Sequence, residues 1–335
     1  MWQDYHYNNI WRFALNISMA NLSKKFNVKL SESLRADLWL FDASKKTDPN
    51  SISSLKSYLK FYGLPSKSDN LALHVGTTDD QDIVAMAWAP TESEGVAIIV
   101  HGYMDHIGLY GHLIQELLER NLTVLCFDAR GHGLSIGARC SISNFSEYVN
   151  DLEKIILLAQ KQFSGPLHAV GQSMGGAILI KHLLNVSNPA TYPFATLNLL
   201  TPLLQPWGWT QSRRLFWLSR WFIKSIKRVF RPSSWDKEFL TFLKDSDPMQ
   251  PKRLPLDWVG AMDQWVKEFE KLPLSEFPVH IIQGNHDKTL DWVHNLKQFA
   301  LKFPLSTVSI IENANHHLVN ESAPLRKEIF SALRF

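Results

Sequence analysis

The sequence predicts an α/β protein with a mostly parallel central sheet, helices on both faces of the sheet and an inserted helical cap. From residue 71 onward, short apolar runs alternate with helical patterns, and several of these runs are nearly continuous in Val, Ile and Leu. Such runs are typical of strands that are covered on both faces, and the alternation is typical of parallel sheets. A long stretch without any strand pattern, residues 203–273, predicts the cap.

The strands are predicted at eight places along the chain. They are residues 71–78, 82–90, 95–102, 122–130, 166–171, 195–202, 279–284 and 306–313. Helical periodicity is clearest in residues 113–121, 145–163 and 174–185. In a sheet of this kind, functional side chains gather at the carboxyl ends of the strands.

The chain divides into three parts. Residues 1–69 form a polar N-terminal extension that is partly helical, residues 70–202 and 274–335 form the α/β core, and residues 203–273 form the cap, or lid. The cap holds seven of the twelve tryptophans of the chain, and we expect a helical insertion rather than a second domain.

Composition narrows the class of protein. A net charge of +3 on 335 residues is too small to predict nucleic-acid binding. Cys126 and Cys140 give neither a paired metal-ligand spacing nor a disulfide framework, which favours a reducing compartment. Residues 1–21 lack a signal-peptide pattern, and no apolar run reaches the roughly eighteen residues of a membrane span. We therefore expect a cytoplasmic protein that can contact the inner face of a membrane peripherally.

The segment HAVGQSMGGAIL, residues 168–179, sets one serine between two glycines. Ser173 comes where a predicted strand turns sharply into a helix, and the small residues Gly171 and Gly175 relieve the crowding of that turn. The turn lifts the serine hydroxyl and directs the first helical N–H groups at whatever the oxygen attacks. Glycine-rich turns also bind phosphate, so the nucleophile interpretation depends on finding its partners.

A serine hydroxyl is a weak nucleophile unless an imidazole removes its proton and a carboxylate orients that imidazole. Asp287 follows the seventh predicted strand, and His316 and His317 follow the last one. We expect Asp287 rather than Asp291 to be the acid, because Asp287 lies closer to the strand end, and Asp291 can cap the helix that begins there. We expect His316 to be the base, with His317 as the alternative.

An oxyanion site completes such a centre. The loop 101–110 follows a predicted strand and contains a glycine, which lets one backbone N–H face the site. We assign the hole to the N–H groups of Tyr103 and Met174. Loss of one such donor typically costs about a hundredfold to a thousandfold in rate. No group of His, Asp and Glu has metal-site spacing, so we expect no metal and no cofactor.

Five motifs occur in order within residues 70–335. They are HGYMDHIGLYGHL (101–113), FDARGHGLS (127–135), GQSMGGA (171–177), QGNHD (283–287) and NANHHLVNES (313–322). Together they resemble the α/β-hydrolase superfamily, and within it the group that contains monoacylglycerol lipases and bacterial lysophospholipases. The resemblance implies the α/β-hydrolase fold, the triad Ser173, Asp287 and His316, and Tyr103 and Met174 as oxyanion donors. One departure is His317, where monoacylglycerol lipases often have Glu.

Other polar residues of these motifs have structural interpretations. We expect His101, His106 and His132 to be hydrogen-bonding loop residues, with His106 the one that approaches substrate. Asp128 and Arg130 are expected to form a structural turn that holds a loop over the site.

The run QSRRLFWLSRWFIKSIKRVFR, residues 211–231, carries seven Arg and Lys and no acid. On a helical wheel its apolar residues fall on one face, namely Leu215, Phe216, Leu218, Phe222, Ile223, Ile226, Val229 and Phe230. Its cations fall on the other face, namely Arg213, Arg214, Arg220, Lys224, Lys227, Arg228 and Arg231. Trp217 and Trp221 join the basic side.

Such a helix commonly packs its apolar face on the core and leaves its basic face in solvent. Two tryptophans among seven cations are also the composition of a helix that lies in a lipid interface. We expect residues 211–231 to contact an anionic membrane, and we assign substrate contacts to Trp217 and Trp221 in addition to His106.

The predicted function is a serine carboxylic-ester hydrolase that acts on monoacyl lipids, most specifically a lysophospholipase. A monoacylglycerol lipase and a short-chain esterase or thioesterase are alternatives that differ in the leaving group. A catalytically silent fold that binds lipid is an alternative of another class. A peptidase ranks last, because it would need an acidic anchor for the substrate amine, which the basic cap does not favour.

Overall fold

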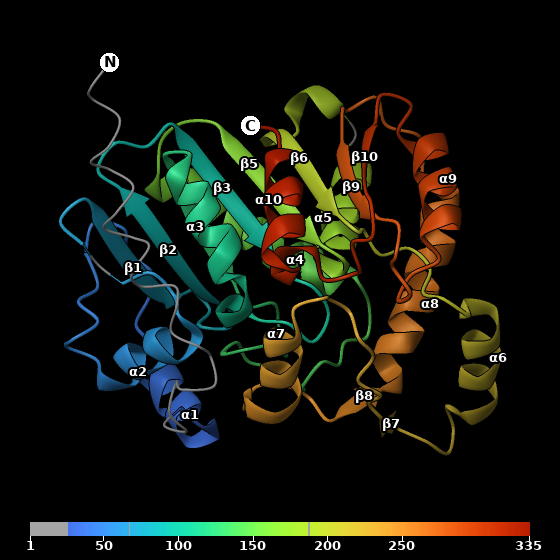
Figure 1. The fold of residues 1–335 in the computed structure, drawn as a ribbon, viewed down its shortest axis with the longest axis horizontal. Helices are drawn as coiled ribbons and strands as arrows, with labels where there is room; N and C mark the ends of the chain where they lie inside the picture. Colours follow the sequence, from blue (N-terminus) through green and yellow to red (C-terminus); the bar gives the residue numbers. More distant parts are fainter. Residues whose placement is uncertain (1–25, 67, 187) are drawn as a thin grey trace.

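The central sheet has eight strands in the order β1-β2-β4-β3-β5-β6-β9-β10 (Figure 1). This computed structural model describes residues 26–66, 68–186 and 188–335. The strands are β1 Leu71–Thr77, β2 Val84–Pro90, β3 Gly95–Val100, β4 Leu122–Phe127, β5 Leu167–Gln172, β6 Phe194–Leu200, β9 His280–Gly284 and β10 Thr307–Ile311. The strands β1 and β2 pair antiparallel and all pairs from β4 to β10 are parallel, so the predicted mostly parallel sheet is confirmed.

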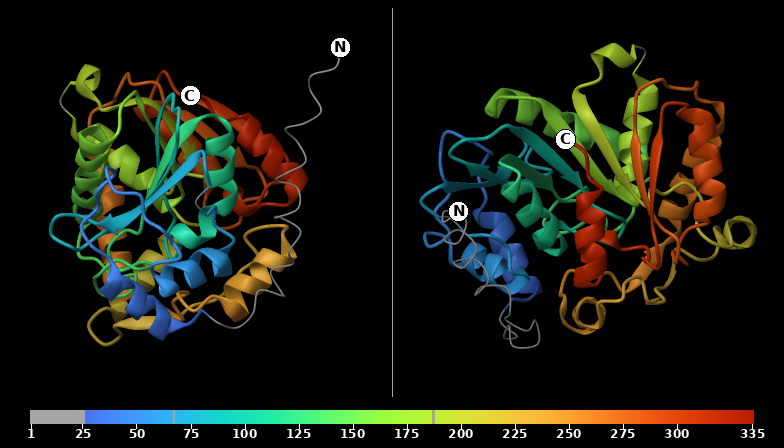
Figure 2. Two further views of the ribbon diagram at one scale, coloured as in Figure 1. Left: turned by 90° about the vertical axis from the view of Figure 1, so that its left-hand side faces the viewer. Right: turned by 45° about the horizontal axis from the view of Figure 1, so that its top comes forward.

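Helices cover both faces of this sheet, as Figures 1 and 2 show. The helices of the core are α3 Gly111–Glu119, α4 Ser146–Gln162, α5 Met174–Asn185, α9 Trp292–Lys302 and α10 Ala323–Ser331. Buried side chains of α4, α5 and α9 form one apolar cluster with the sheet, and those of α3 and α10 form a second. Strands β3, β4 and β5 are buried along their whole length, because each lies between these two clusters.

The described part of the N-terminal extension contributes two helices, α1 (Val28–Asp37) and α2 (Ser53–Tyr62). Buried side chains of α2 join the apolar cluster of α3 and α10. The expectation about residues 1–21 and the start of the extension lie outside the described residues. Within the described ranges, no helix combines the length and apolar character that a membrane crossing requires.

The cap segment, residues 203–273, contains helices and a short two-stranded ribbon. Its elements are α6 Trp209–Ser219, β7 Ser225–Lys227, α7 Lys237–Thr241, a π-helical turn Phe242–Ser246, β8 Arg253–Pro255 and α8 Leu256–Lys271. Helix α8 buries Trp258, Met262 and Trp265 in the cluster beneath α4 and α5. Figure 1 shows α6 at the outer edge of the molecule, beside α8.

The prediction of one helix over residues 211–231 is wrong. Helix α6 ends at Ser219. Strand β7 then pairs with β8 in an antiparallel ribbon, in which the Arg253 guanidinium donates to the hydroxyl and the carbonyl oxygen of Ser225. Of the predicted apolar face, Phe216 alone is buried in the described structure, where it packs on Gly260 of α8. A helix gains most of its stability from tertiary packing, so the residues beyond Ser219 gain more by pairing with β8 than by continuing the helix.

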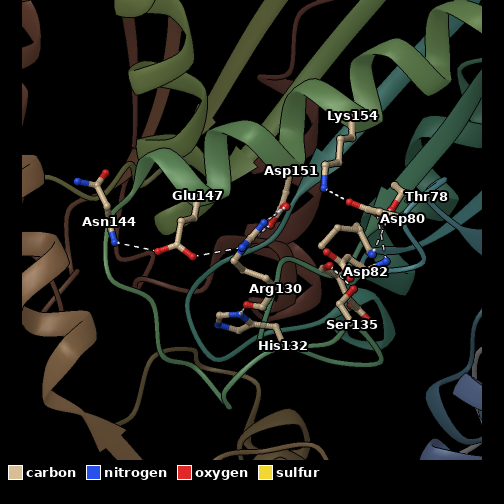
Figure 3. A network of polar contacts seen from close by, with 12 residues as sticks. Thr78, Asp80, Asp82, Arg130, His132, Ser135, Asn144, Glu147, Asp151 and Lys154 are labelled. Atoms are coloured by element: carbon tan, nitrogen blue, oxygen red, sulfur yellow. Dashed lines mark hydrogen bonds and ion pairs between the residues drawn. The ribbon is translucent and has the colours of Figure 1, made fainter.

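The turn after β4 is held by the polar network of Figure 3. Arg130 makes a two-pronged contact with Asp151 of α4, at 2.6 and 2.7 Å, and a further ion pair with Glu147 at 3.2 Å. Asp128 accepts the backbone N–H groups of Ile107 and Leu134 at 2.7 and 2.8 Å. The two residues thus tie the turn to its neighbours.

Candidate active site

Ser173 lies in a strained turn between β5 and α5. Its φ is 51° and its ψ is −109°, a conformation that a non-glycine residue adopts only when its surroundings enforce it. Two backbone hydrogen bonds do so: the Ser173 N–H donates to Leu200 at 2.8 Å, and the Leu203 N–H donates to Ser173 at 3.0 Å. A Cβ on Gly175 would come within 1.9 Å of the Val100 carbonyl oxygen, so the close packing of this turn requires glycine there.

Three side chains from the ends of three strands meet at this turn. His316 Nε2 is 2.9 Å from the Ser173 hydroxyl oxygen, and His316 Nδ1 is 2.8 Å from a carboxylate oxygen of Asp287. Ser173 follows β5, Asp287 follows β9 and His316 follows β10. All three are buried, with 4 to 9% of each residue exposed. A charge developing on this chain of groups is therefore largely shielded from solvent.

The second carboxylate oxygen of Asp287 is held by the protein backbone. It accepts N–H groups from Thr289 and Leu290 at 2.7 and 3.1 Å. Burial raises the pKa of the Asp287 carboxyl, but the nearby His316 and these hydrogen bonds outweigh burial, so the net pKa lies below its ordinary value. An ionised Asp287 accepts from Nδ1–H of His316, which leaves Nε2 free to take a proton from Ser173.

The alternative residues occupy other places. Asp291 is the N-cap of α9 and accepts the His294 N–H at 3.2 Å, as an aspartate at a helix start should. His317 points away from Ser173, with its Nε2 at an ion-pair distance of 3.2 Å from Asp105. That contact lacks the angle of a hydrogen bond.

The two backbone N–H groups that the sequence assigns to the oxyanion hole, those of Tyr103 and Met174, lack protein acceptors among the described residues. Met174 is the first residue of α5, whose N–H has no partner inside the helix. The Tyr103 side chain is held at two points, since its hydroxyl donates to Cys140 at 2.7 Å and its ring stacks on Trp258 of α8 at 3.7 Å. Sequence reasoning did not identify this contact between the cap and the oxyanion loop.

A buried carboxylate supports the same loop. The Tyr110 hydroxyl donates to Asp105 at 2.9 Å and accepts the Gly102 N–H at 2.8 Å. Burial raises the pKa of the Asp105 carboxyl, but the neighbouring His317 and Tyr110 outweigh burial and bring that pKa well below its ordinary range. Asp105 therefore connects the turn that carries Tyr103 to the loop that carries His316.

The histidines of the motifs have both structural partners and buried positions. His101 contacts the Gly102 carbonyl at 2.7 Å and accepts the Ala129 N–H at 2.9 Å. His132 contacts the Arg130 carbonyl at 3.0 Å.

His106 departs from the expectation that it approaches substrate. Only 1% of this residue is exposed, its Nε2 is 3.0 Å from Asp247 of the cap segment and its Nδ1 accepts the Gly108 N–H. Tyr62 of α2 donates to the same Asp247 at 2.8 Å. His106 thus joins the N-terminal extension, the loop after β3 and the cap, because two buried partners occupy both of its ring nitrogens.

Trp217 and Trp221 also differ from their expected role. Both lie on the outer surface of the cap segment, 42% and 77% exposed, with the Arg220 guanidinium stacked over both rings at 3.8 and 4.7 Å. Trp207 and Trp235 instead border the cavity beside Asp287. The helical wheel could not reveal this, because it assumed one helix over residues 211–231, whereas helix α6 ends at Ser219. Among the described residues, no group of three or more His, Cys, Asp and Glu is placed to hold a metal ion.

Comparisons with known proteins support the fold and indicate the family to which the chain belongs. A monoacylglycerol lipase from Mycolicibacterium smegmatis is 36% identical over 102 residues, which is 30% of this chain and 36% of that protein. The phospholipase YtpA from Bacillus subtilis is 30% identical over 102 residues, 30% of this chain and 39% of that protein. The aligned segment thus spans little more than a third of each relative.

A solved structure of a soluble variant of the monoglyceride lipase from Saccharomyces cerevisiae shares the fold, with a TM-score of 0.67 at 20% identity. The likeness covers 80% of this chain and 96% of that one. The pattern of the Hydrolase_4 family, described as serine aminopeptidase S33, matches residues 91–323. This match spans most of the chain and includes β3 to β10, with Ser173, Asp287 and His316 among its residues. The chain therefore belongs to the Hydrolase_4 family of α/β-hydrolases.

Proposed function

We propose that this protein is a serine hydrolase that cleaves the carboxylic ester of monoacyl lipids through an acyl-enzyme on Ser173. The proposal rests above all on one observation, the hydrogen-bonded chain from the Ser173 hydroxyl through His316 to Asp287. Similarity to a monoacylglycerol lipase and to a phospholipase supports the lipid substrate class.

The reaction follows from the geometry. His316 Nε2 takes the hydroxyl proton as the Ser173 oxygen attacks the acyl carbonyl carbon. The N–H groups of Tyr103 and Met174 stabilise the oxyanion of the tetrahedral intermediate. When the ester C–O bond breaks, His316 returns the proton to the leaving alcohol. Water then attacks the acyl-enzyme by the same route and releases the fatty acid.

Among the possible leaving groups, we favour the phosphate-bearing glycerol of a lysophospholipid. Three cations border the cavity beside Asp287, whereas glycerol itself carries no charge for them to bind. An aminopeptidase would need a free carboxylate to hold the substrate ammonium. Asp287 is the one acidic residue among the described residues of the cavity, and it already binds His316.

The test is a panel of esters with one acyl chain, namely lysophosphatidylcholine, the matching monoacylglycerol and p-nitrophenyl butyrate as a short ester. We expect wild type to hydrolyse the monoacyl lipids, and Ser173→Ala to lose turnover by on the order of 10⁵-fold while keeping its unfolding temperature. A fluorophosphonate probe should label wild type and not the variant. An unlabelled wild type would indicate a silent fold that only binds lipid.

We further propose that the exposed surface of α6 and β7 contacts an anionic membrane at its periphery. The apolar residues Leu218, Trp221 and Phe222 are 76, 77 and 87% exposed. Exposed cations lie among them, including Arg214 and Lys224, and residues 209–231 contain no acid. Exposed apolar side chains beside cations suit a lipid interface, where each cation contributes about 1 kcal/mol.

Co-sedimentation with vesicles tests this second proposal. We expect stronger binding to phosphatidylcholine vesicles that contain phosphatidylglycerol than to phosphatidylcholine alone, and weaker binding for Phe222→Gln. Leu301→Gln is the matched control, since Leu301 is 74% exposed on α9 of the core. Equal binding to both kinds of vesicle would contradict the proposal.

A further inference from the structure

A cavity of about 1010 Å³ lies beside the acid of the triad. The cap segment contributes one wall, including Trp207, Arg231 and Trp235, and the loop after β9 contributes the other, with Asp287 and Lys288. This volume is within the range of pockets that hold small molecules. Of Ser173, His316 and Asp287, the last is the one among the residues that border the cavity.

The charge of the cavity is positive. Three cations border it, namely Arg231 and Lys237 of the cap segment and Lys288 of the loop after β9. Within the described ranges, none of the three forms an ion pair with a carboxylate. The negative charge of Asp287 is already directed at His316. Three cations without a protein counterion therefore surround a space that suits an anion.

The cap wall is fixed to the loop that carries the catalytic histidine. The His317 N–H donates to Ser233 at 2.8 Å, and the Ser234 hydroxyl donates to Asn320 at 2.6 Å. The Trp235 N–H donates to Glu321 at 2.9 Å. The segment between Arg231 and Lys237 is thus anchored at three successive residues, which holds these two cations at a set position relative to His316.

An aromatic wall completes the cavity. The Trp235 indole N–H donates to Asn313 at 2.7 Å, and its ring lies 5.3 Å from His286 at an angle of 34°. Trp207 is anchored through its backbone N–H, which donates to Thr289 at 2.9 Å. The combination of aromatic side chains with cations fits a ligand that has both an anionic group and an organic part.

We propose that this cavity binds the phosphodiester of a single-chain phospholipid while its acyl ester is at Ser173. The inference rests on the proposed function and deepens it, because it assigns the substrate class to particular residues. In such a lipid the glycerol joins the phosphate to the ester, and the phosphate carries the negative charge that Arg231, Lys237 and Lys288 would bind. Arginine suits phosphate because its planar guanidinium donates two hydrogen bonds at once.

The experiment compares lysophosphatidylcholine with the monoacylglycerol of the same acyl chain, each below its critical micelle concentration so that no lipid interface is present. In Arg231→Gln and in Lys237→Gln, we expect the ratio of kcat/KM for the two substrates to fall by about tenfold, through KM, because a charge-assisted hydrogen bond is lost. Lys244→Gln is the matched control, since Lys244 is an exposed cap lysine that does not border the cavity. It should leave the ratio unchanged.

Inorganic phosphate distinguishes a lipid headgroup from the free ion. Phosphate could inhibit p-nitrophenyl butyrate hydrolysis in wild type but not in Arg231→Gln, while Arg231→Gln leaves the ratio of kcat/KM for the two lipids unchanged. In that case the cavity binds free phosphate and the headgroup proposal is overturned. An unchanged ratio without such inhibition also overturns it. Both results are compatible with the proposed serine hydrolase activity, whereas failure of the fluorophosphonate probe to label Ser173 would reject the proposed function itself.

Discussion

Large aromatic side chains have opposite surroundings in the central sheet and in the outer part of the cap segment. Trp88 on β2 and Trp265 on α8 are fully buried, whereas Trp221 and Phe222 are 77 and 87% exposed. Helix α8 is part of the hydrophobic core, because its apolar face joins the cluster that includes buried residues of α4 and α5. Helix α6 contacts α8 through the buried Phe216 ring, which lies beside Gly260, and through an ion pair of Arg213 with Asp263.

The difference indicates where stability and recognition reside. Burying an aromatic side chain removes a large apolar area from water and contributes directly to folding. An exposed apolar surface makes no such contribution, and in a folded protein it often marks a place where something else binds. The sheet and α8 therefore hold Ser173, Asp287 and His316 in place, whereas the exposed side chains of α6 and β7 contribute little to folding.

The largest effect should come from the core. Asp287→Asn should lower turnover by on the order of 10⁴-fold, because an amide cannot hold His316 in the required tautomer or stabilise its cation. Steady-state kinetics on a monoacyl ester measures this loss. Asp291→Asn is the control: it keeps the helix cap of α9 and should keep turnover. Equal activity in both variants would indicate that a residue other than Asp287 orients His316.

A pair of truncations measures the stability difference between the two regions. Trp265→Ala should lower the free energy of unfolding by about 3–5 kcal/mol, because it leaves a cavity among buried side chains. Phe222→Ala should change that free energy by no more than about 0.5 kcal/mol, since the ring is 87% exposed. Urea denaturation determines both values. A large loss in Phe222→Ala would show that α6 and β7 are packed in solution.

Acid should destabilise the core, where the buried histidines lie, whereas residues 203–273 contain no histidine. Burial lowers the pKa of His132 to about 3 and that of His182 to about 4, so both stay neutral in the folded protein. The unfolded chain binds these protons below about pH 6.5, and stability is therefore lost as pH falls from that value towards 4.

The share of His182 in this acid effect can be measured separately. His182, on α5, packs against Tyr192 and Phe194. Protonation of His182 should lower the free energy of unfolding by on the order of 2 kcal/mol at pH 4. In His182→Leu the unfolding free energy, measured by urea titration at several pH values, should decline less steeply. His106 acts in the opposite sense: burial lowers its pKa, but Asp247 outweighs burial and the net pKa is raised. A slope that His182→Leu leaves unchanged would contradict this assignment.

Several features of the site could be read from local sequence. The strand that ends before Ser173 and the glycines around it are predictable, because a sharp turn excludes a Cβ at Gly175 whatever the rest of the fold does. Sequence favours Asp287 over Asp291 because Asp287 follows the strand end more closely, and an aspartate at a helix start can be a cap. In the structure Asp287 contacts His316 and Asp291 caps α9, while the catalytic role of Asp287 stays a prediction.

Other features had no local signal. The stacking of Tyr103 on Trp258, the contact of Asp105 with His317 and the burial of His106 each join residues far apart in the chain. The helix predicted over residues 211–231 failed for the same reason, since the apolar period is present but, within the described structure, Phe216 is the one residue of that face that is buried.

The sequence alone determined the strands, the sharp turn at Ser173 and the chemical types of the triad, because hydrophobic periodicity and backbone sterics act over a few residues. Only the tertiary structure decided which cations of the cap line a cavity and which face solvent, and where its helices end. Those outcomes depend on which distant side chains are available to pack or to pair, and no short stretch of chain contains that information.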